Sequence, residues 1–105
     1  MVKVYKYGDY YFAGVSHVIP GYLQDVVFVY KQGNNWTSIS AEKLRTNNGS
    51  LIQIAERIKY ATHEDDIEKA VSELKRMGIK IEEVDKPPFP LKILEGKKKI
   101  QAEFD

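Results

Sequence analysis

The chain has 105 residues, of which 43% are hydrophobic and 30% are charged, and its formal net charge at pH 7 is +1. This balance is typical of a soluble globular protein, and the length predicts a single domain over residues 1–105. So small a net charge excludes a global field that attracts nucleic acid or anionic lipid, so any such affinity requires a local patch. The absence of cysteine excludes disulfide bonds and thiolate sites.

The sequence shows no targeting or membrane signal. The N-terminal residues Met1–Tyr5 have no apolar signal-peptide core, and the longest apolar run, Val26–Tyr30, is too short to span a bilayer. We therefore expect an intracellular, cytoplasmic protein that does not bind membranes. Enrichment of lysine, glutamate and isoleucine in the second half favours a thermophilic archaeal source, although the Asn34–Asn35 and Asn47–Asn48 pairs argue against it. A small chain of this composition also suits a virus or mobile element.

The first forty residues are predicted to form an antiparallel meander. Apolar and basic residues alternate at the N-terminus, turn residues follow at Gly8-Asp9, and a third run is almost continuously apolar, as expected of a central strand. The four strands are expected at Val2–Tyr7, Tyr10–Ser16, Asp25–Tyr30 and Trp36–Ile39.

Residues 41–78 change to helical periodicity and predict two amphipathic helices after a single turn at Ala41–Arg45. Ser50 and Gln53 fit a capping box at the start of the first helix, and the Thr62 hydroxyl can cap the second. Gly78 is suited to a left-handed residue after the second helix. The buried stripes are expected to be Leu51, Ile54, Ala55 and Ile58, and then Ile67, Ala70, Val71, Leu74 and Met77.

The C-terminal part returns to strand patterns. Ile79–Val84 alternates, Lys86–Pro90 forms a stiff extended connector, and Leu91–Leu94 and Ile100–Phe104 are predicted to form a hairpin. Runs of strands, then helices, then strands predict an α+β fold, with one twisted sheet and both helices on one face.

An alternative divides the chain near residue 40 and makes residues 50–104 a separate unit. The segment Ile67–Ile79 resembles the third helix and wing entry of winged-helix domains. This resemblance implies DNA binding, but the helix would meet the DNA with His63 and the acids Glu64–Asp66, and phosphate repels carboxylates. In this alternative the wing lysines or another surface must bind.

No catalytic, metal or cofactor site is predicted. Ser16 and His17 are adjacent, so in a strand they point to opposite faces and cannot act as nucleophile and base. His63 beside Glu64–Asp66 does not have metal-ligand spacing, and no glycine-rich phosphate loop is present. We therefore expect a binding protein rather than an enzyme.

One candidate binding feature is a basic tip. Lys97, Lys98 and Lys99 follow Glu95-Gly96 at the predicted C-terminal hairpin turn, and Lys92 is nearby along the chain. Such a tip can contact phosphates, with an affinity that falls as salt rises. The alternative is a solvated turn whose lysines protect a sheet edge.

The other candidate is the N-terminal hairpin, where Lys3 and Lys6 alternate with Tyr5 and Tyr7. If the valines face the core, these tyrosines face outward and can stack on unpaired bases. The alternatives are ordinary packing, with both sheet faces covered, and a dimer interface, in which aromatic residues are enriched. Trp36 has the same three interpretations.

Together these features predict a small non-catalytic accessory protein that associates with nucleic acid through its basic tip and its Lys/Tyr strand surface. The alternative is a protein-interaction module, such as an inhibitor, adaptor or regulatory subunit, with a second copy of the chain as one candidate partner. No cofactor is expected in either case.

Overall fold

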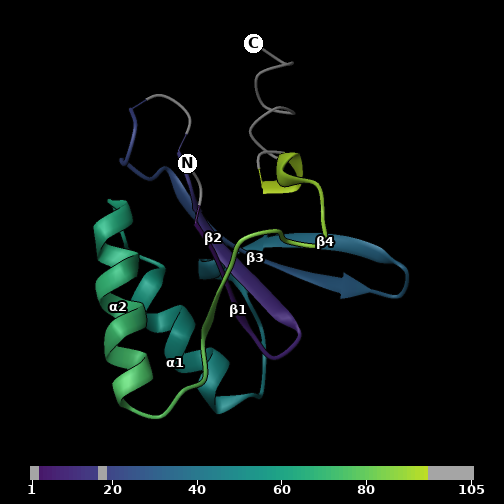
Figure 1. Cartoon of the computed structure of the whole chain (residues 1–105). Coiled ribbons are helices and arrows are strands. Elements are labelled where there is room, and N and C mark those ends of the chain that lie inside the picture. The colour runs from purple at the N-terminus through teal and green to yellow at the C-terminus, as the bar shows by residue number, and fades with distance from the viewer. Residues whose placement is uncertain (1–2, 17–18, 95–105) are drawn as a thin grey trace.

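The computed structural model describes residues 3–16 and 19–94 of the chain. They form a five-stranded antiparallel sheet in the order β4-β3-β2-β1-β5, with two helices packed on one face (Figure 1). This confirms the predicted α+β class and the N-terminal meander. The elements are β1 (Val4–Tyr7), β2 (Tyr10–Val15), β3 (Asp25–Gln32), β4 (Asn35–Ser40), the 3₁₀ turn η1 (Ala41–Lys43), α1 (Gly49–Ile58), α2 (Glu64–Arg76), β5 (Glu82–Val84) and the 3₁₀ turn η2 (Leu91–Leu94).

Two tight turns set the register of the meander. Tyr7 pairs with Tyr10 across the β1–β2 turn, and Gln32 pairs with Asn35 across the β3–β4 turn. Two-residue turns that match the strand twist need positive φ, and here Gly8 (φ 58°) and Gly33 (φ 64°) provide it.

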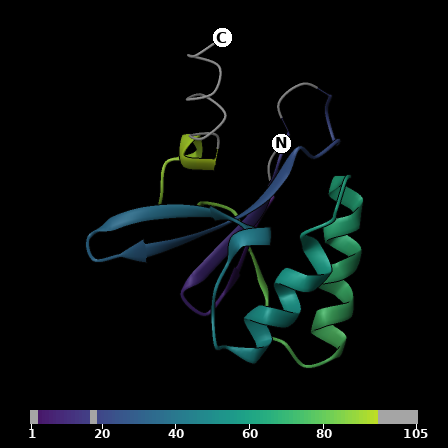
Figure 2. The ribbon, with the colours of Figure 1, turned by 180° about the vertical axis from the view of Figure 1, so that it is seen from behind.

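The sheet is covered on both faces. Tyr5, Phe12 and Phe28 pair across three strands and join the buried residues of α1 and α2 in what we call the helix-side core. The opposite face carries a second cluster, the back core, which Phe89 and Leu94 of the C-terminal segment cover. The back core consists of Val4, Tyr11, Ala13, Val15, Val27, Val29, Phe89 and Leu94. The yellow-green segment that leads into η2 crosses in front of the strands in Figure 1. Figure 2 shows the opposite face of the sheet, where η1 lies in front of the strands.

The first helix buries its predicted stripe but begins earlier than predicted. Leu51, Ile54, Ala55 and Ile58 are all buried. The capping box predicted on Ser50 is wrong, because the helix begins at Gly49. Its cap is Asn48, whose Oδ1 accepts a hydrogen bond of 3.1 Å from the Leu51 N–H.

The second helix also begins differently from the prediction. His63 is the N-cap, and the Asp66 carboxylate accepts hydrogen bonds of 3.1 Å from the N–H groups of both Thr62 and His63. The predicted stripe is buried except for Met77, which is 53% exposed because the helix ends at Arg76. Gly78 has the predicted left-handed conformation, with φ 93°.

The C-terminal part joins the same sheet. β5 pairs antiparallel with β1, with Val84 opposite Val4 and Glu82 opposite Lys6. This pairing contradicts the alternative in which residues 50–104 form a separate winged-helix unit. The strand predicted at Leu91–Leu94 is also wrong, because this segment turns as η2 and places Leu94 in the back core. The strand predicted at Ile100–Phe104 lies outside the described residues. Neither helix of the described residues combines the length and the apolar character that spanning a bilayer requires.

Candidate nucleic-acid interface

A notch lies where two hairpins of unequal length separate. β2 pairs with β3 only from Tyr11 opposite Val29 onward, so the end of β3 beyond that point pairs with β4 alone. Figure 1 shows the two hairpins diverging on the side away from the helices. The cavity between them, about 430 Å³, is called here the hairpin notch. Its lining residues are Lys6, Asp9, Tyr10, Tyr11, Tyr30, Lys31 and Trp36.

Two lysines of the notch stand over aromatic rings. The Lys6 Nζ lies 5.8 Å from the ring centroid of Tyr11, and the Lys31 Nζ lies 5.6 Å from that of Trp36. In each case the pair is directly opposite in the sheet, Lys6 across β1–β2 and Lys31 across β3–β4. Attraction between ammonium and ring orients each cation without neutralising it. Neither lysine forms a salt bridge with another described residue.

Other aromatic contacts hold the rings of the notch in place. Phe89 lies 5.4 Å between ring centroids from both Tyr11 and Trp36. On the helix side of the sheet, the rings of Tyr10 and Tyr30 are 5.1 Å apart. Tyr10, Tyr30 and Trp36 are each half-buried. Their positions are therefore fixed before any ligand arrives, which lowers the entropic cost of binding.

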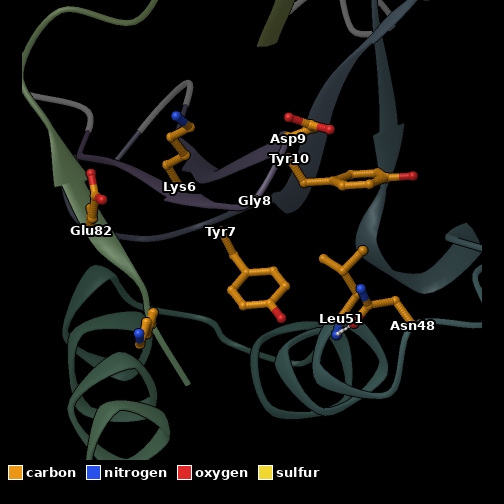
Figure 3. A pocket seen from close by; sticks show the side chains of 9 residues that line it. Lys6, Tyr7, Gly8, Asp9, Tyr10, Asn48, Leu51 and Glu82 are labelled. Carbon is orange, nitrogen blue, oxygen red and sulfur yellow. Dashed lines mark hydrogen bonds between the residues drawn. The ribbon is translucent and has the colours of Figure 1, made fainter. Parts of the chain in front are cut away.

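A second cavity, about 490 Å³, lies on the other side of the β1–β2 turn and is called here the turn pocket. Figure 3 shows the Tyr7 ring pointing toward Leu51 at the start of α1, while the Lys6 side chain points the opposite way. Two lysines and two carboxylates line this pocket, whereas two lysines and the single carboxylate of Asp9 line the notch, so the notch favours an anion more. The pocket is lined by Lys6, Tyr7, Gly8, Asp9, Tyr10, Asn48, Leu51, Lys80 and Glu82.

Three of the predicted binding residues gather near the notch. Lys6 and Trp36 line it directly. Trp36 also borders a shallow apolar cavity of about 390 Å³ beside η2, where Lys92 is part of the lining. Tyr7 lies in the turn pocket instead. The predicted tip at Lys97–Lys99 lies outside the described residues.

Two predicted residues lie elsewhere. Tyr5 is only 4% exposed, and its ring stacks on Phe12 with centroids 5.5 Å apart, so it cannot offer a face to a base. The expectation that Tyr5 faces outward fails because both sheet faces are covered. Burial raises the pKa of Tyr5 to about 12. Lys3 is held by Glu68 of α2 in a salt bridge of 2.8 Å, away from the notch residues.

The prediction missed Lys31 and Tyr30 as parts of the site, whereas Tyr10 belongs to the predicted aromatic and basic N-terminal hairpin. Lys31 and Trp36 flank the β3–β4 turn, and a two-residue turn at Gly33 places them directly opposite each other. That register was readable from the turn residues. The notch itself depends on the unequal lengths of two hairpins, which no local pattern indicates.

Among the described residues there is no group of three or more side chains that could hold a metal ion. His63 Nδ1 lies 3.9 Å from the Asp66 carboxylate, which instead accepts the backbone hydrogen bonds at the start of α2. Those backbone hydrogen bonds lower the pKa of Asp66.

Comparison with known proteins gave no match to a family model, a curated protein or a solved structure.

Proposed function

We propose that this protein is a small non-catalytic module that binds single-stranded nucleic acid at the hairpin notch. The observation that carries the proposal is the pairing of Lys6 with Tyr11 and of Lys31 with Trp36 on one face of the sheet. Trp36 is half-buried and can offer its ring, whereas Tyr11 is buried and serves to position Lys6. A cation beside a partly exposed ring is the combination that proteins use to bind single strands, because phosphates need charge and bases need a flat apolar surface.

The energetics of this surface favour single strands over duplexes. Stacking of a base on an aromatic ring contributes about 1–3 kcal/mol, and every base has a face that can stack only when it is unpaired. Trp36 supplies such a ring on the face that carries both lysines, and Tyr30 lines the notch from the helix side of the sheet. The net charge of +1 limits long-range attraction, so binding depends on these local contacts.

Fluorescence offers a direct test, because Trp36 is the single tryptophan of the chain. We expect oligonucleotides of single-stranded DNA or RNA to quench its emission with micromolar affinity at low salt, and duplexes to bind more weakly. For two phosphate contacts, log K should fall with log salt with a slope of about −1.4. Absence of binding to any of these probes at low salt would overturn the proposal.

Reversing the charge of the two notch lysines tests whether nucleic acid binds at the notch. The double variant Lys6→Glu with Lys31→Glu should weaken binding strongly and remove most of the salt dependence. The matched control is Lys69→Glu with Lys75→Glu, which makes the same charge change at exposed positions of α2. Equal weakening in both variants would mean that net charge, rather than the notch, governs binding.

The contribution of base stacking is tested by removing an aromatic ring from the notch and, as a control, one outside it. Tyr30→Leu removes a ring from the notch, whereas Tyr60→Leu removes a ring that is 73% exposed and lies under Lys59, outside the notch. Only the first change should reduce affinity. If Lys97–Lys99 also contact phosphates, the natural chain should show a slope steeper than about −1.4, and their reversal to glutamate should bring it back toward that value.

A protein-interaction role is the second candidate. The apolar cavity beside η2 favours it, because Trp36, Pro90 and Ile93 line it and Leu91 nearby is 52% exposed. An inhibitor, adaptor or regulatory subunit that uses this cavity would lose its partner on Trp36→Ala and would show little salt dependence. The salt titration therefore separates the two functions.

A further inference from the structure

The two edges of the sheet differ in a way that bears on self-association. β5, at one edge, has three residues, of which Glu82 and Glu83 carry charges. β4, at the other edge, has six residues and no charged side chain. Natural sheets protect their edges with short strands, charges, prolines or bulges, because an open edge pairs readily with another strand. β5 has two of these protections. β4 has none of them, and η2, which contacts β4, packs with Trp36 over the back core.

The geometry of β4 suits such pairing. It is matched to β3 residue by residue, from Asn35 opposite Gln32 to Ser40 opposite Val27, without an interrupting bulge. Within residues 3–16 and 19–94, no strand pairs with its outer edge. The backbone groups that point outward from β4 therefore form a regular, unpaired ladder.

We propose that β4 pairs antiparallel with β4 of a second copy of this chain, which joins the two sheets into one. In such a pairing each β4 lies beside the β4 of the other copy. Charged side chains on a strand would therefore face like charges and repel them, whereas the uncharged β4 has no such repulsion. The opposite edge could not associate in this way, because glutamates would face glutamates.

Side-chain alternation restricts where the two-fold axis passes. Residues opposite each other in an antiparallel pair point to the same face, so the axis must run perpendicular to the sheet and pass midway between the two copies of one residue. Near the middle of β4 this residue is Thr37 or Ser38. Either choice places the helices of both copies on one face. With the axis at Thr37, two threonines meet, which is a favourable cross-strand pair.

The pairing also brings both notches together. Trp36 belongs to β4, and in the joined sheet the two copies present it on the same face. If the proposed function holds, one strand of nucleic acid could engage both notches with a gain in avidity. The dimer itself does not depend on that function.

Single-cysteine variants of the full chain test the pairing directly, since the natural sequence contains no cysteine. We expect Thr37→Cys or Ser38→Cys, whichever lies on the axis, to form a disulfide-linked dimer under mild oxidation. Glu82→Cys on β5 is the matched control at the other edge and should crosslink much less. Crosslinking no greater at β4 than at β5 would overturn the proposal.

Sedimentation of the unmodified protein supplies an independent readout. We expect a concentration-dependent dimer for the natural chain, and a monomer with unchanged circular dichroism for Thr37→Lys or Ser38→Lys, because two ammonium groups would meet at the axis. A natural chain that is monomeric at every concentration would overturn the proposal, as would a dimer that survives both substitutions. Neither measurement uses nucleic acid, so failure here is distinct from failure of the proposed function.

Discussion

The backbone of Gly14 in β2 lies directly against the side chain of Leu23. A Cβ added at Gly14 would lie 2.7 Å from Leu23 Cδ2 and 3.0 Å from Ile67 Cδ1 of α2. Leu23 and Ile67 are both buried in the helix-side core. The missing side chain thus lets the chain before β3 and the second helix approach the same point of the sheet, which links the meander to the helical layer.

Gly14→Ala should therefore destabilise the protein by about 1–3 kcal/mol, because the added methyl overpacks a filled core. Chemical denaturation followed by circular dichroism measures this change. Leu23→Ala should partly relieve it, so the double variant should lose less stability than the two single changes summed. Gly49→Ala is the control, since nothing lies within 4 Å of its added Cβ. If Gly14→Ala left the unfolding free energy unchanged, Leu23 and Ile67 would have room to move aside, which would contradict the overpacking argument.

The cap of α1 gives a second prediction. Asn48→Ala removes the acceptor for the Leu51 N–H and should cost about 1 kcal/mol of unfolding free energy. Asn47→Ala, one residue earlier and exposed, should change stability by less than about 0.5 kcal/mol. Thermal or denaturant unfolding compares the two. Equal effects would mean that Asn48 does not cap the helix.

The helix stripe is tested by the pair Leu74 and Met77. Leu74 is fully buried between the helices and the sheet, and Leu74→Ala should cost about 2–5 kcal/mol through lost packing and a cavity. Met77→Ala should cost less than about 1 kcal/mol, because that side chain is half-exposed. A large loss of stability in Met77→Ala would mean that Met77 is buried, as the helical periodicity predicted.

Glu64 gives a pH-dependent prediction. Burial, and to a smaller degree Glu68, raises the pKa of its carboxyl above the ordinary value of 4.5. Its Oε1 is buried and has no hydrogen-bond partner among the described residues. A carboxyl with a raised folded-state pKa binds its proton more tightly when folded, so stability falls as pH rises from the unfolded pKa through the folded one.

Glu64→Gln should therefore stabilise the protein near neutral pH by up to about 1 kcal/mol, a figure reduced for the partial exposure of the side chain. Well below pH 4.5, where the carboxyl is protonated in both states, the gain should vanish. Unfolding free energies at several pH values measure this. Asp65→Asn, an exposed neighbour in the same first turn, should show no such gain. A gain from Glu64→Gln that is equal at all pH values would contradict the burial argument.

Local patterns predicted the elements well and their ends less well. The alternation in β1 and the stripes of both helices repeat over short distances, so they are visible without knowledge of the fold. Helix starts were misplaced because neighbouring polar residues compete for the same backbone groups. Ser50 and Thr62 are reasonable caps on sequence alone, yet Asn48 and Asp66 are the side chains that accept the hydrogen bonds.

The candidate site was predicted in part. Lys6 and Trp36 stood out because lysine and aromatic residues alternate near turns, and both line the notch. Tyr5 has the same local pattern but is buried. Which tyrosine is exposed depends on where the helices end over the sheet, and that is a property of packing rather than of neighbouring residues.

The sequence by itself determined the class of the fold, the order of its strands along the meander and the apolar faces of its helices, because side-chain periodicity and turn chemistry act over a few adjacent residues. Only the tertiary structure decided that the back of the sheet is covered and that the notch exists. Phe89 meets Tyr11 and Trp36 across a large distance in the chain. Contacts of that kind arise when apolar surfaces far apart in sequence are removed from water together, and they leave no periodic trace in the sequence.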